Sequence, residues 1–310
     1  MSLELQVEQH HKLKYASDTA MVAQQMQNPL RNAVTIVSAD GEAQSTADLL
    51  GEDEYVRGAS RDTRNPEVSS KDTRRWLVYP EYAIEHGKTI YKVDTFKKMM
   101  DPTSTTMRKG VAAVERGIFD TILGVVPKPG GKFSITGAGI MGRATEGKRP
   151  GSAQALPSAN YIAHGGLGLN TEKLRSATEA MELENFGLET DDEMFALISP
   201  KQKTDLLNLA LATKVNLNQF DLNQIKTGKP TTLLGITWIF TNRLPVNKTG
   251  NRLVPIWSKS NIVAGFWQDL QGRIWNNGER KNLPYAFTDA ILDCVRHQDG
   301  GVRIIECVEA

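Results

Sequence analysis

The sequence predicts a fold of the α+β class, and three observations support that prediction. Residues 101–123 form one long segment with helical periodicity. Short stretches rich in strand-forming residues follow in the second half of the chain. Before the helix, residues 40–94 are densely charged and carry too few apolar side chains to form a core of their own. We therefore expect helices packed on sheets, with one long charged excursion.

The long helix is marked at both ends and along one face. Asp101 is a good N-cap, Pro102 suits the first helical position, and Gly124 follows where the pattern stops. Apolar residues recur at steps of three and four, which predicts a buried stripe. The stripe consists of Met107, Val111, Val114, Ile118 and Ile122. Such a helix is roughly 33 Å long, so it needs a long apolar partner.

Composition excludes several classes of protein. The chain has 310 residues, 40% of them hydrophobic, so it can build a substantial core. Its 37 basic residues are balanced by 36 acidic ones, so the overall charge does not favour nucleic acid or an anionic membrane. Two cysteines, Cys294 and Cys307, make no disulfide framework, and the N-terminus lacks the apolar core of a signal peptide. We expect folding in a reducing cytosol and no membrane span.

The remainder of the chain alternates between loops and short regular elements. Residues 127–168 are rich in Gly, Pro and Ser, which predicts a long loop with one short strand at 132–136. Asn170 and Gly187 bound a predicted helix, and Ser199 with Gln202 has the spacing of a capping box for another. Asp299-Gly300, between two strand-forming runs, predicts a C-terminal hairpin. The other predicted strands are 193–199, 231–244 and 260–267.

Basic and acidic residues are mixed throughout the charged excursion. A nucleic-acid surface would be mainly of one sign with aromatic residues between the charges, whereas mixed signs suit a protein partner. From charge alone, an ordinary solvated face is an equally good interpretation. The candidate contacts with such a partner are Glu52, Asp53, Glu54, Arg57, Arg61, Arg64, Arg74 and Arg75.

One motif suggests chemistry. Residues 137–142, GAGIMG, match the glycine pattern of dinucleotide-binding loops. That function requires a helix to begin at once and an acidic residue about 20 positions later, and neither follows here. The alternative reading, an NAD-binding oxidoreductase, depends on this loop alone. No histidine or cysteine spacing marks a catalytic, cofactor-binding or metal site, so we expect no enzyme and no cofactor.

Several longer stretches, taken in order, resemble a known family. They are TRRWLVYPEYAIEHGKTIYKVDTFKKMMDPTSTTMRKGVAAVERGIFDTIL, LNTEKLRSATEAMELENFG, MFALISPKQKTDLLN and the closing GGVRIIECV. This order resembles the major capsid proteins of tailed bacteriophages, which have the HK-97 (Hong Kong 97) fold. In those proteins a charged hairpin leads through D-P-T-S into a helix with an A-x-x-R-x-x-D-like centre. Ala113, Arg116 and, one position late, Asp120 stand there in this sequence.

The resemblance implies a division of the chain into four parts. An N-terminal arm would cover about 1–40 and an extended loop (E-loop) about 41–95. A peripheral domain would combine 96–125, which holds the long spine helix, with 256–310. An axial domain would occupy 126–255. The spine helix would then lie along a long sheet to which the C-terminal hairpin contributes.

The resemblance also implies a function and partners. The chain would assemble with copies of itself, as hexamers and pentamers, into the icosahedral shell of a tailed phage that encloses double-stranded DNA. The short N-terminus implies a separate scaffolding protein. A portal protein, and in some lineages a decoration protein, would join the shell, and the packaged DNA would be contacted non-specifically. Assembly would take place in the cytoplasm of the bacterial host, and the finished protein would reside in the virion.

Overall fold

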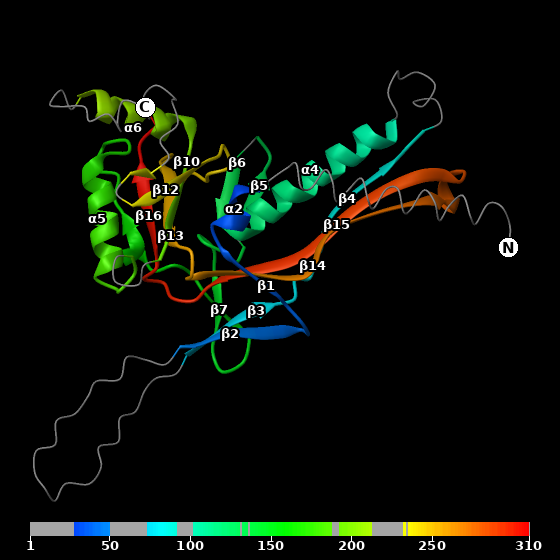
Figure 1. The fold of residues 1–310 in the computed structure, drawn as a ribbon, viewed down its shortest axis with the longest axis horizontal. Coiled ribbons are helices and arrows are strands. Elements are labelled where there is room, and N and C mark those ends of the chain that lie inside the picture. Colours follow the sequence, from blue (N-terminus) through cyan, green and yellow to red (C-terminus); the bar gives the residue numbers. More distant parts are fainter. Residues whose placement is uncertain are drawn as a thin grey trace, which may run out of the picture.

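The structure is a computed structural model of the α+β class, and Figure 1 shows its arrangement. It describes residues 28–49, 73–91, 102–130, 132–135, 137–187, 192–212, 232–233 and 235–309. The helices are α2 (Pro29–Asn32), α4 (Pro102–Leu123), η1 (Ser158–Asn160), α5 (Thr171–Glu182), α6 (Pro200–Ala212) and η2 (Gly278–Arg280).

Within the described residues, the strands form four sheets. The early strands are β1 (Thr35–Ser38), β2 (Ala43–Leu49), β3 (Thr73–Val78), β4 (Ile84–Thr89), β5 (Val125–Lys128), β6 (Lys132–Ile135), β7 (Ala144–Glu146) and β8 (Ser152–Gln154). The later strands are β9 (Tyr161–Ile162), β10 (Met194–Ile198), β11 (Thr232–Leu233), β12 (Ile236–Phe240), β13 (Arg252–Ser258), β14 (Ile262–Asn277), β15 (Leu283–Arg296) and β16 (Val302–Cys307).

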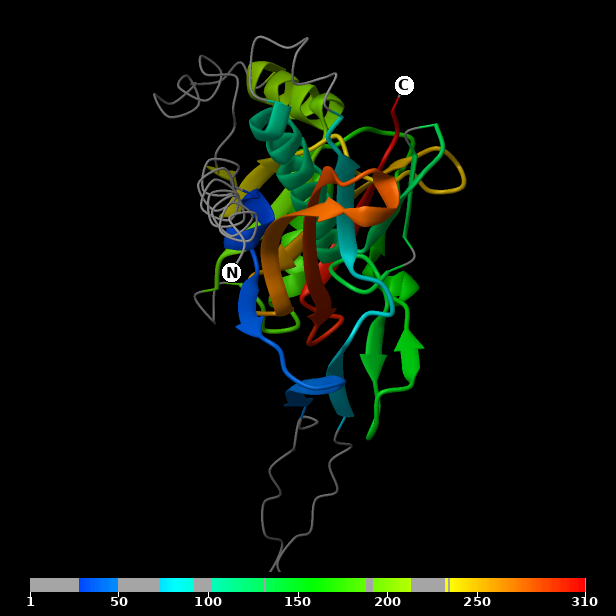
Figure 2. The ribbon, with the colours of Figure 1, turned by 90° about the vertical axis from the view of Figure 1, so that its right-hand side faces the viewer.

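A long antiparallel hairpin of β14 and β15 forms the centre of one sheet. The sheet has the order β1-β14-β15-β4, with β1 parallel to β14 and β4 antiparallel to β15. Figure 2 looks at the hairpin from its distal end, with β1 on one side of it and β4 on the other. Two register shifts in β14, between Phe266 and Gln271, bend the hairpin near its middle.

Helix α4 is the long helix that the sequence predicts, and it lies along one face of this hairpin sheet (Figure 1). All five stripe residues are buried, with Ile118 completely inaccessible. Gly117 lets the helix approach β4, since a Cβ there would lie 2.4 Å from a methyl group of Ile84. The helix therefore has the long apolar partner that its stripe requires.

The six-stranded sheet forms the other half of the molecule, in the order β11-β12-β10-β13-β16-β9. Strand β10 is buried at every position, as expected for a strand covered on both faces. Its Phe195 stacks on Trp257 of β13, whose indole donates a hydrogen bond to the carbonyl of Ala33, 2.8 Å away. One continuous apolar core joins this sheet to the inner part of α4.

Helices α5 and α6 begin where the capping signals predict. The side chain of Asn170 accepts a hydrogen bond from the backbone N–H of Lys173, at 2.9 Å. The side chain of Gln202 accepts the N–H of Ser199, at 3.3 Å. Helix α5 ends at Glu182, before the predicted stop at Gly187, because the chain turns through a left-handed residue at Asn185.

The predicted hairpin around Asp299-Gly300 is wrong. Strand β15 pairs with β14 and β4, whereas β16 pairs with β13 and β9, so the turn passes the chain from one sheet to another. An Asp-Gly pair favours a tight turn but does not determine which strands pair beyond it. The long loop predicted at 127–168 also contains more regular structure than expected. It holds β6, β7, β8, η1 and β9, of which only β6 was anticipated.

Candidate assembly surfaces

The root of the charged excursion is a two-stranded ribbon of β2 and β3. These strands pair antiparallel from Ala43 opposite Val78 to Leu49 opposite Thr73, so both ends of the intervening segment start side by side. The ribbon belongs to the sheet β2-β3-β7-β8, which lies below the hairpin sheet in Figure 1. Leu77 is fully buried and packs in a separate apolar cluster with β7, β14 and β15. The ribbon root is therefore part of the folded body.

A buried charged cluster fixes the ribbon root. The guanidinium of Arg75 on β3 lies 3.3 Å from the carboxylates of both Glu146 on β7 and Asp299 between β15 and β16. Asp299 also accepts a hydrogen bond from Arg296, at 2.6 Å. Arg296 is fully buried and donates in addition to the carbonyls of Gly142 and Gln154. Segments far apart in the sequence are thus held by one network of charges.

Burial in this cluster changes the protonation of its neighbour His297. Desolvation, and then the positive charge of Arg75, lower the pKa of the imidazole. Its Nε2 is buried and has no hydrogen-bond partner among the described residues. The histidine therefore favours its neutral form beside the arginine pair.

The predicted contact residues divide into three groups. Glu52, Asp53, Glu54, Arg57, Arg61 and Arg64 lie outside the described residues. Arg74 is exposed on β3. Arg75 is only 5% exposed and pairs with carboxylates of its own chain, so the expectation that it faces a neighbouring subunit needs correction. Side chains alternate between the two faces of a strand, which points Arg74 outward and Arg75 inward.

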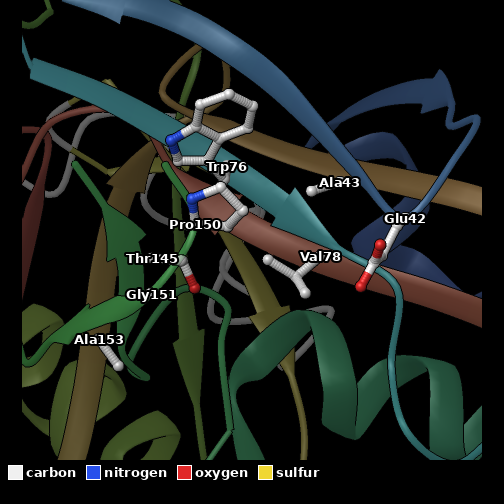
Figure 3. Close-up of a pocket in the computed structure, with 8 residues that line it drawn as sticks. All are labelled: Glu42, Ala43, Trp76, Val78, Thr145, Pro150, Gly151 and Ala153. Atoms are coloured by element: carbon white, nitrogen blue, oxygen red, sulfur yellow. The ribbon is translucent and has the colours of Figure 1, made fainter. Parts of the chain in front are cut away.

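An open groove lies on the outer face of the ribbon sheet, with a volume of about 690 Å³. Figure 3 shows Trp76 and Pro150 beside each other in it, with Val78 on the same strand as Trp76. The indole of Trp76 donates to the carbonyl of Gly147, at 2.8 Å, which ties the groove wall to the β7–β8 turn. The groove is lined by Glu42, Ala43, Trp76, Val78, Thr145, Pro150, Gly151 and Ala153.

Aromatic side chains gather near the distal end of the long hairpin. The ring of Trp275 lies 5.0 Å from that of Tyr285 and 5.7 Å from that of Phe287, measured between centroids. Gly87 on β4 leaves room for Tyr285, whose hydroxyl would lie 1.8 Å from a Cβ at that position. Trp275 is 37% exposed, so the cluster presents apolar surface to solvent. The cluster was not anticipated, because its members join only when β14, β15 and β4 pair.

Comparison with known proteins identifies the family of the chain that carries these surfaces. The profile of a family described as phage capsid protein matches residues 7–309, nearly the whole chain. The chain belongs to the phage capsid protein family. It is a shell-forming major capsid protein, a structural component of the virion and not an enzyme. Self-assembly with further copies is therefore its function, which confirms the expectation drawn from the order of its motifs.

Solved structures show that this capsid protein has the HK-97 fold. The capsid of Cyanophage P-SCSP1u superposes with a TM-score of 0.63 at 13% identity, covering 92% of this chain and 89% of that one. A chain of Mycobacterium phage Che8 gives 0.62 at 11% identity, covering 90% and 91%. The SrpI encapsulin of Synechococcus elongatus PCC 7942 gives 0.59 at 10% identity, covering 91% and 88%. A search of curated proteins finds no significant match.

The GAGIMG loop has a structural role in the capsid protein. The N–H groups of Ile140 and Met141 donate to the carbonyls of Ile122 and Leu123, each at 3.0 Å. These carbonyls belong to the last turn of α4, where helical acceptors have no intrahelical partner. Nucleotide loops instead place phosphate at a helix N-terminus. The loop thus caps the end of α4, and the oxidoreductase reading has no support.

The two cysteines, the other groups that could carry chemistry, are part of the core. Cys294 and Cys307 are both fully buried, and burial raises the pKa of the Cys307 thiol to about 12. Within the described part of the chain, no three His, Cys, Asp or Glu side chains are placed to hold a metal ion. None of the helices in that part is long and apolar enough to cross a bilayer.

Proposed function

We propose that the capsid protein forms the icosahedral shell of a tailed phage, arranged as hexamers and pentamers around double-stranded DNA. The observation that carries this proposal is the match of family and fold along nearly the whole chain. Assembly would take place in the host cytoplasm with a separate scaffolding protein. A portal protein would complete the shell, and a decoration protein would be an optional addition.

The domain division suggested by the resemblance follows the sheets only in part, because β13 crosses the boundary at 255 and β16, in the peripheral range, pairs with β13 in the six-stranded sheet. The peripheral domain, 96–125 with 256–310, would contain α4 and the long hairpin, and the axial domain, 126–255, would contain α5, α6 and β10. The N-terminal arm, 1–40, would end in α2 and β1, where Arg31 bridges Glu115 of α4 and Asp269 of β14. The E-loop, 41–95, would leave the folded body through the ribbon root, and its last part would include β4 of the hairpin sheet.

The E-loop would contact a neighbouring subunit through residues 50–72. This segment holds 23 residues, so a hairpin of that length reaches about 36 Å at 3.3 Å per residue. Its charges of both signs would meet complementary charges on the neighbour, and each contact would be repeated at every subunit boundary. A rigid root is needed to aim such a loop, and the Arg75 cluster supplies it.

The loop can be removed without disturbing its root. Because Leu49 and Thr73 are paired across the ribbon, an Asn-Gly turn can replace residues 50–72. We expect the shortened chain to fold with an unchanged urea midpoint but to form no shells in sedimentation with the scaffolding partner. Shells at normal yield would overturn the assignment of this segment as an intersubunit arm.

A charge-reversal variant tests the contact in more detail. Replacing Arg57, Arg61 and Arg64 with Glu should prevent assembly at low salt, because like charges then meet at every boundary. At about 1 M salt the screening length falls to roughly 3 Å, so assembly should partly recover. Normal shells from this variant at low salt would show that the segment is only a solvated face.

A further inference from the structure

Strand β8 leaves one edge of the ribbon sheet open. It is the last strand in the order β2-β3-β7-β8, so among the described residues only its β7 side is paired. Figure 2 shows the green β7 and β8 at the margin of the molecule, beside the ribbon. All three residues of β8 are exposed. An open edge presents N–H and C=O groups that can pair with a further strand.

The hydrogen bonds of β8 indicate which backbone groups reach the open edge. The hydroxyl of Ser152 donates to a backbone carbonyl of β7, at 2.7 Å. The carbonyl of Gln154 accepts from the buried guanidinium of Arg296, at 3.1 Å, and the same guanidinium donates to Gly142, just before β7. Both ends of β8 therefore bond toward β7. Because N–H and C=O groups alternate between the two sides of a strand, those of Ala153 point to the open edge.

This edge lacks the features that usually keep exposed strands from pairing, which are charges, proline and bulges. Pro150 and Pro157 bound the segment 151–156, which contains no charge and no proline. Its pairing with β7 has no register shift. By contrast, β4, at an edge of the hairpin sheet, carries the exposed charges of Glu85 and Lys88. The β8 edge therefore favours addition of a strand.

Building on the proposed function, we propose that β8 pairs antiparallel with β8 of a second copy across a two-fold axis, and so joins neighbouring hexamers and pentamers. Subunits within one ring are related by the ring axis, so their contacts are head-to-tail. A contact of β8 with itself is two-fold symmetric, so it links one ring to the next. The two ribbon sheets then continue into each other as one sheet.

The register of this contact follows from its symmetry. A two-fold axis perpendicular to the sheet keeps the outer faces of both copies on one side and places a residue opposite its own copy. With Ala153 at that place, Ser152 lies opposite the partner's Gln154, and the whole of β8 is paired. The N–H of each Ala153 then donates to the carbonyl of the other. The side chains of β8 are short or flexible, so none obstructs the approach.

The charges beside β8 favour the antiparallel arrangement. Lys148 and Arg149 are exposed in the turn that precedes the strand. Antiparallel pairing places the turns of the two copies at opposite ends of the contact, whereas parallel pairing would bring them together. Arg149 is four positions from the axis, so along an extended chain it lies about 26 Å from its copy, at 3.3 Å per residue. At physiological salt the screening length is about 8 Å, so the two turns do not repel each other strongly.

The contact is small and depends on assembly. Three paired residues on each side cover far less than the roughly 1,200 Å² at which stable interfaces begin. In a shell the same pairing is repeated at every boundary between rings, and subunits already held nearby pair at a high effective concentration. We therefore expect the β8 contact in shells and not in the unassembled chain.

Disulfide cross-linking tests the contact. Both native cysteines are fully buried, so Ala153→Cys introduces one accessible thiol. Opposed Cα atoms in an antiparallel pair are about 4.5 to 5.5 Å apart, within the range of about 4.4 to 6.8 Å that a disulfide spans. Ala159→Cys, at an exposed position outside β8, is the matched control. On mild oxidation of intact shells, Ala153→Cys should form covalent dimers roughly ten times faster than Ala159→Cys, while in unassembled protein the two rates should be equal.

The outcomes separate this contact from the proposed function. Equal cross-linking of the two variants in shells that have formed normally would overturn the β8 contact and leave the proposed function standing. If the wild-type chain forms no shells with the scaffolding partner, the proposed function fails and this inference falls with it.

A proline at the same position tests the backbone bond. Ala153→Pro removes an N–H that faces the open edge, where a strand tolerates proline. Ala153→Thr is the control, because it keeps the N–H and suits a strand. We expect both unassembled variants to keep the wild-type urea midpoint, and only Ala153→Pro to lose shells in sedimentation. Shells of Ala153→Pro at normal yield would overturn the proposal, and the cross-linking result decides the matter should proline disturb the fold.

Discussion

The guanidinium of Arg75 lies 3.3 Å from the carboxylate of Asp299, although the two residues are separated by 224 positions in the chain. Arg75 belongs to the root of the ribbon, and Asp299 lies where the chain passes from the hairpin sheet to the six-stranded sheet. Asp299 also pairs with a second arginine, because Arg296 donates a hydrogen bond to it, at 2.6 Å. A single carboxylate thereby joins the ribbon to both large sheets.

Replacing Asp299 with Asn should destabilise the chain itself. Both arginines are nearly inaccessible, with 6% and 0% of their side chains exposed, so loss of the shared carboxylate leaves buried positive charge poorly compensated. Removing one partner of a buried ion pair costs about 3 to 5 kcal/mol. Urea denaturation of unassembled protein measures the change. Glu81→Gln, at an exposed position, is the control, and an equal stability of the two variants would contradict this account.

Local signals in the sequence predicted local structure well. The helix start at Pro102, the apolar steps of α4 and the capping residues Asn170 and Gln202 act within a few positions of each other, so they are readable without the fold, whereas the predicted N-cap Asp101 lies outside the described residues. Strand partners are set by contacts between distant segments, and no such signal exists for them. The Asp299-Gly300 turn was therefore recognised as a turn but was assigned the wrong partner strand.

The same distinction explains the candidate surfaces. Arg74 and Arg75 look equivalent in the sequence, but β3 has one face on the core, so the two side chains have opposite environments. The three aromatic residues of the hairpin tip come from two strands and give no pattern along the chain. The glycines of GAGIMG were read as loop glycines, and their close contact with the backbone at the end of α4 became visible only in three dimensions.

The buried stripe of α4 gives a second prediction. Ile118 is fully buried in the main core, so Ile118→Ala removes apolar contacts and leaves a cavity. We expect a loss of about 2 to 5 kcal/mol in the free energy of unfolding. Arg116→Ala, two positions away on the exposed side, should change it by less than about 0.5 kcal/mol. Similar midpoints for the two variants in a denaturant titration would mean that the stripe does not hold the helix on its sheet.

The glycine loop gives a third prediction. A Cβ at position 142 would lie 2.0 Å from the carbonyl oxygen of Gly137. The backbone of this loop is hydrogen-bonded to the end of α4, so neither residue can shift easily to make room. Gly142→Ala should therefore cost about 1 to 3 kcal/mol, the usual range for forced overpacking. A Cβ at Gly151 meets nothing within 4 Å, so Gly151→Ala is the matched control. Thermal melts of the two variants that coincide would show that the loop is free to move.

The last prediction concerns pH and the carboxyl group of Asp293, which lies under the ribbon root. Burial raises the pKa of Asp293 from its ordinary value of 3.8 to about 6. The N–H of Val78 donates to this carboxylate, at 2.9 Å, and lowers the pKa by less than burial raises it. Between about pH 4 and pH 6 the folded chain holds a proton that the unfolded chain has lost.

The sign of the effect follows from linkage. Because the folded state binds more protons in this window, the contribution of Asp293 to stability falls as the pH rises from about 4 to 6 and is constant above that. Two pKa units correspond to about 3 kcal/mol, at 1.36 kcal/mol each. Asp293→Asn stays neutral and keeps an oxygen to accept the N–H of Val78. Its free energy of unfolding relative to wild type should rise by about 3 kcal/mol between pH 4 and pH 7, as measured by urea denaturation. Glu85→Gln, on exposed β4, should show no such rise, and parallel pH curves for Asp293→Asn and wild type would refute the raised pKa.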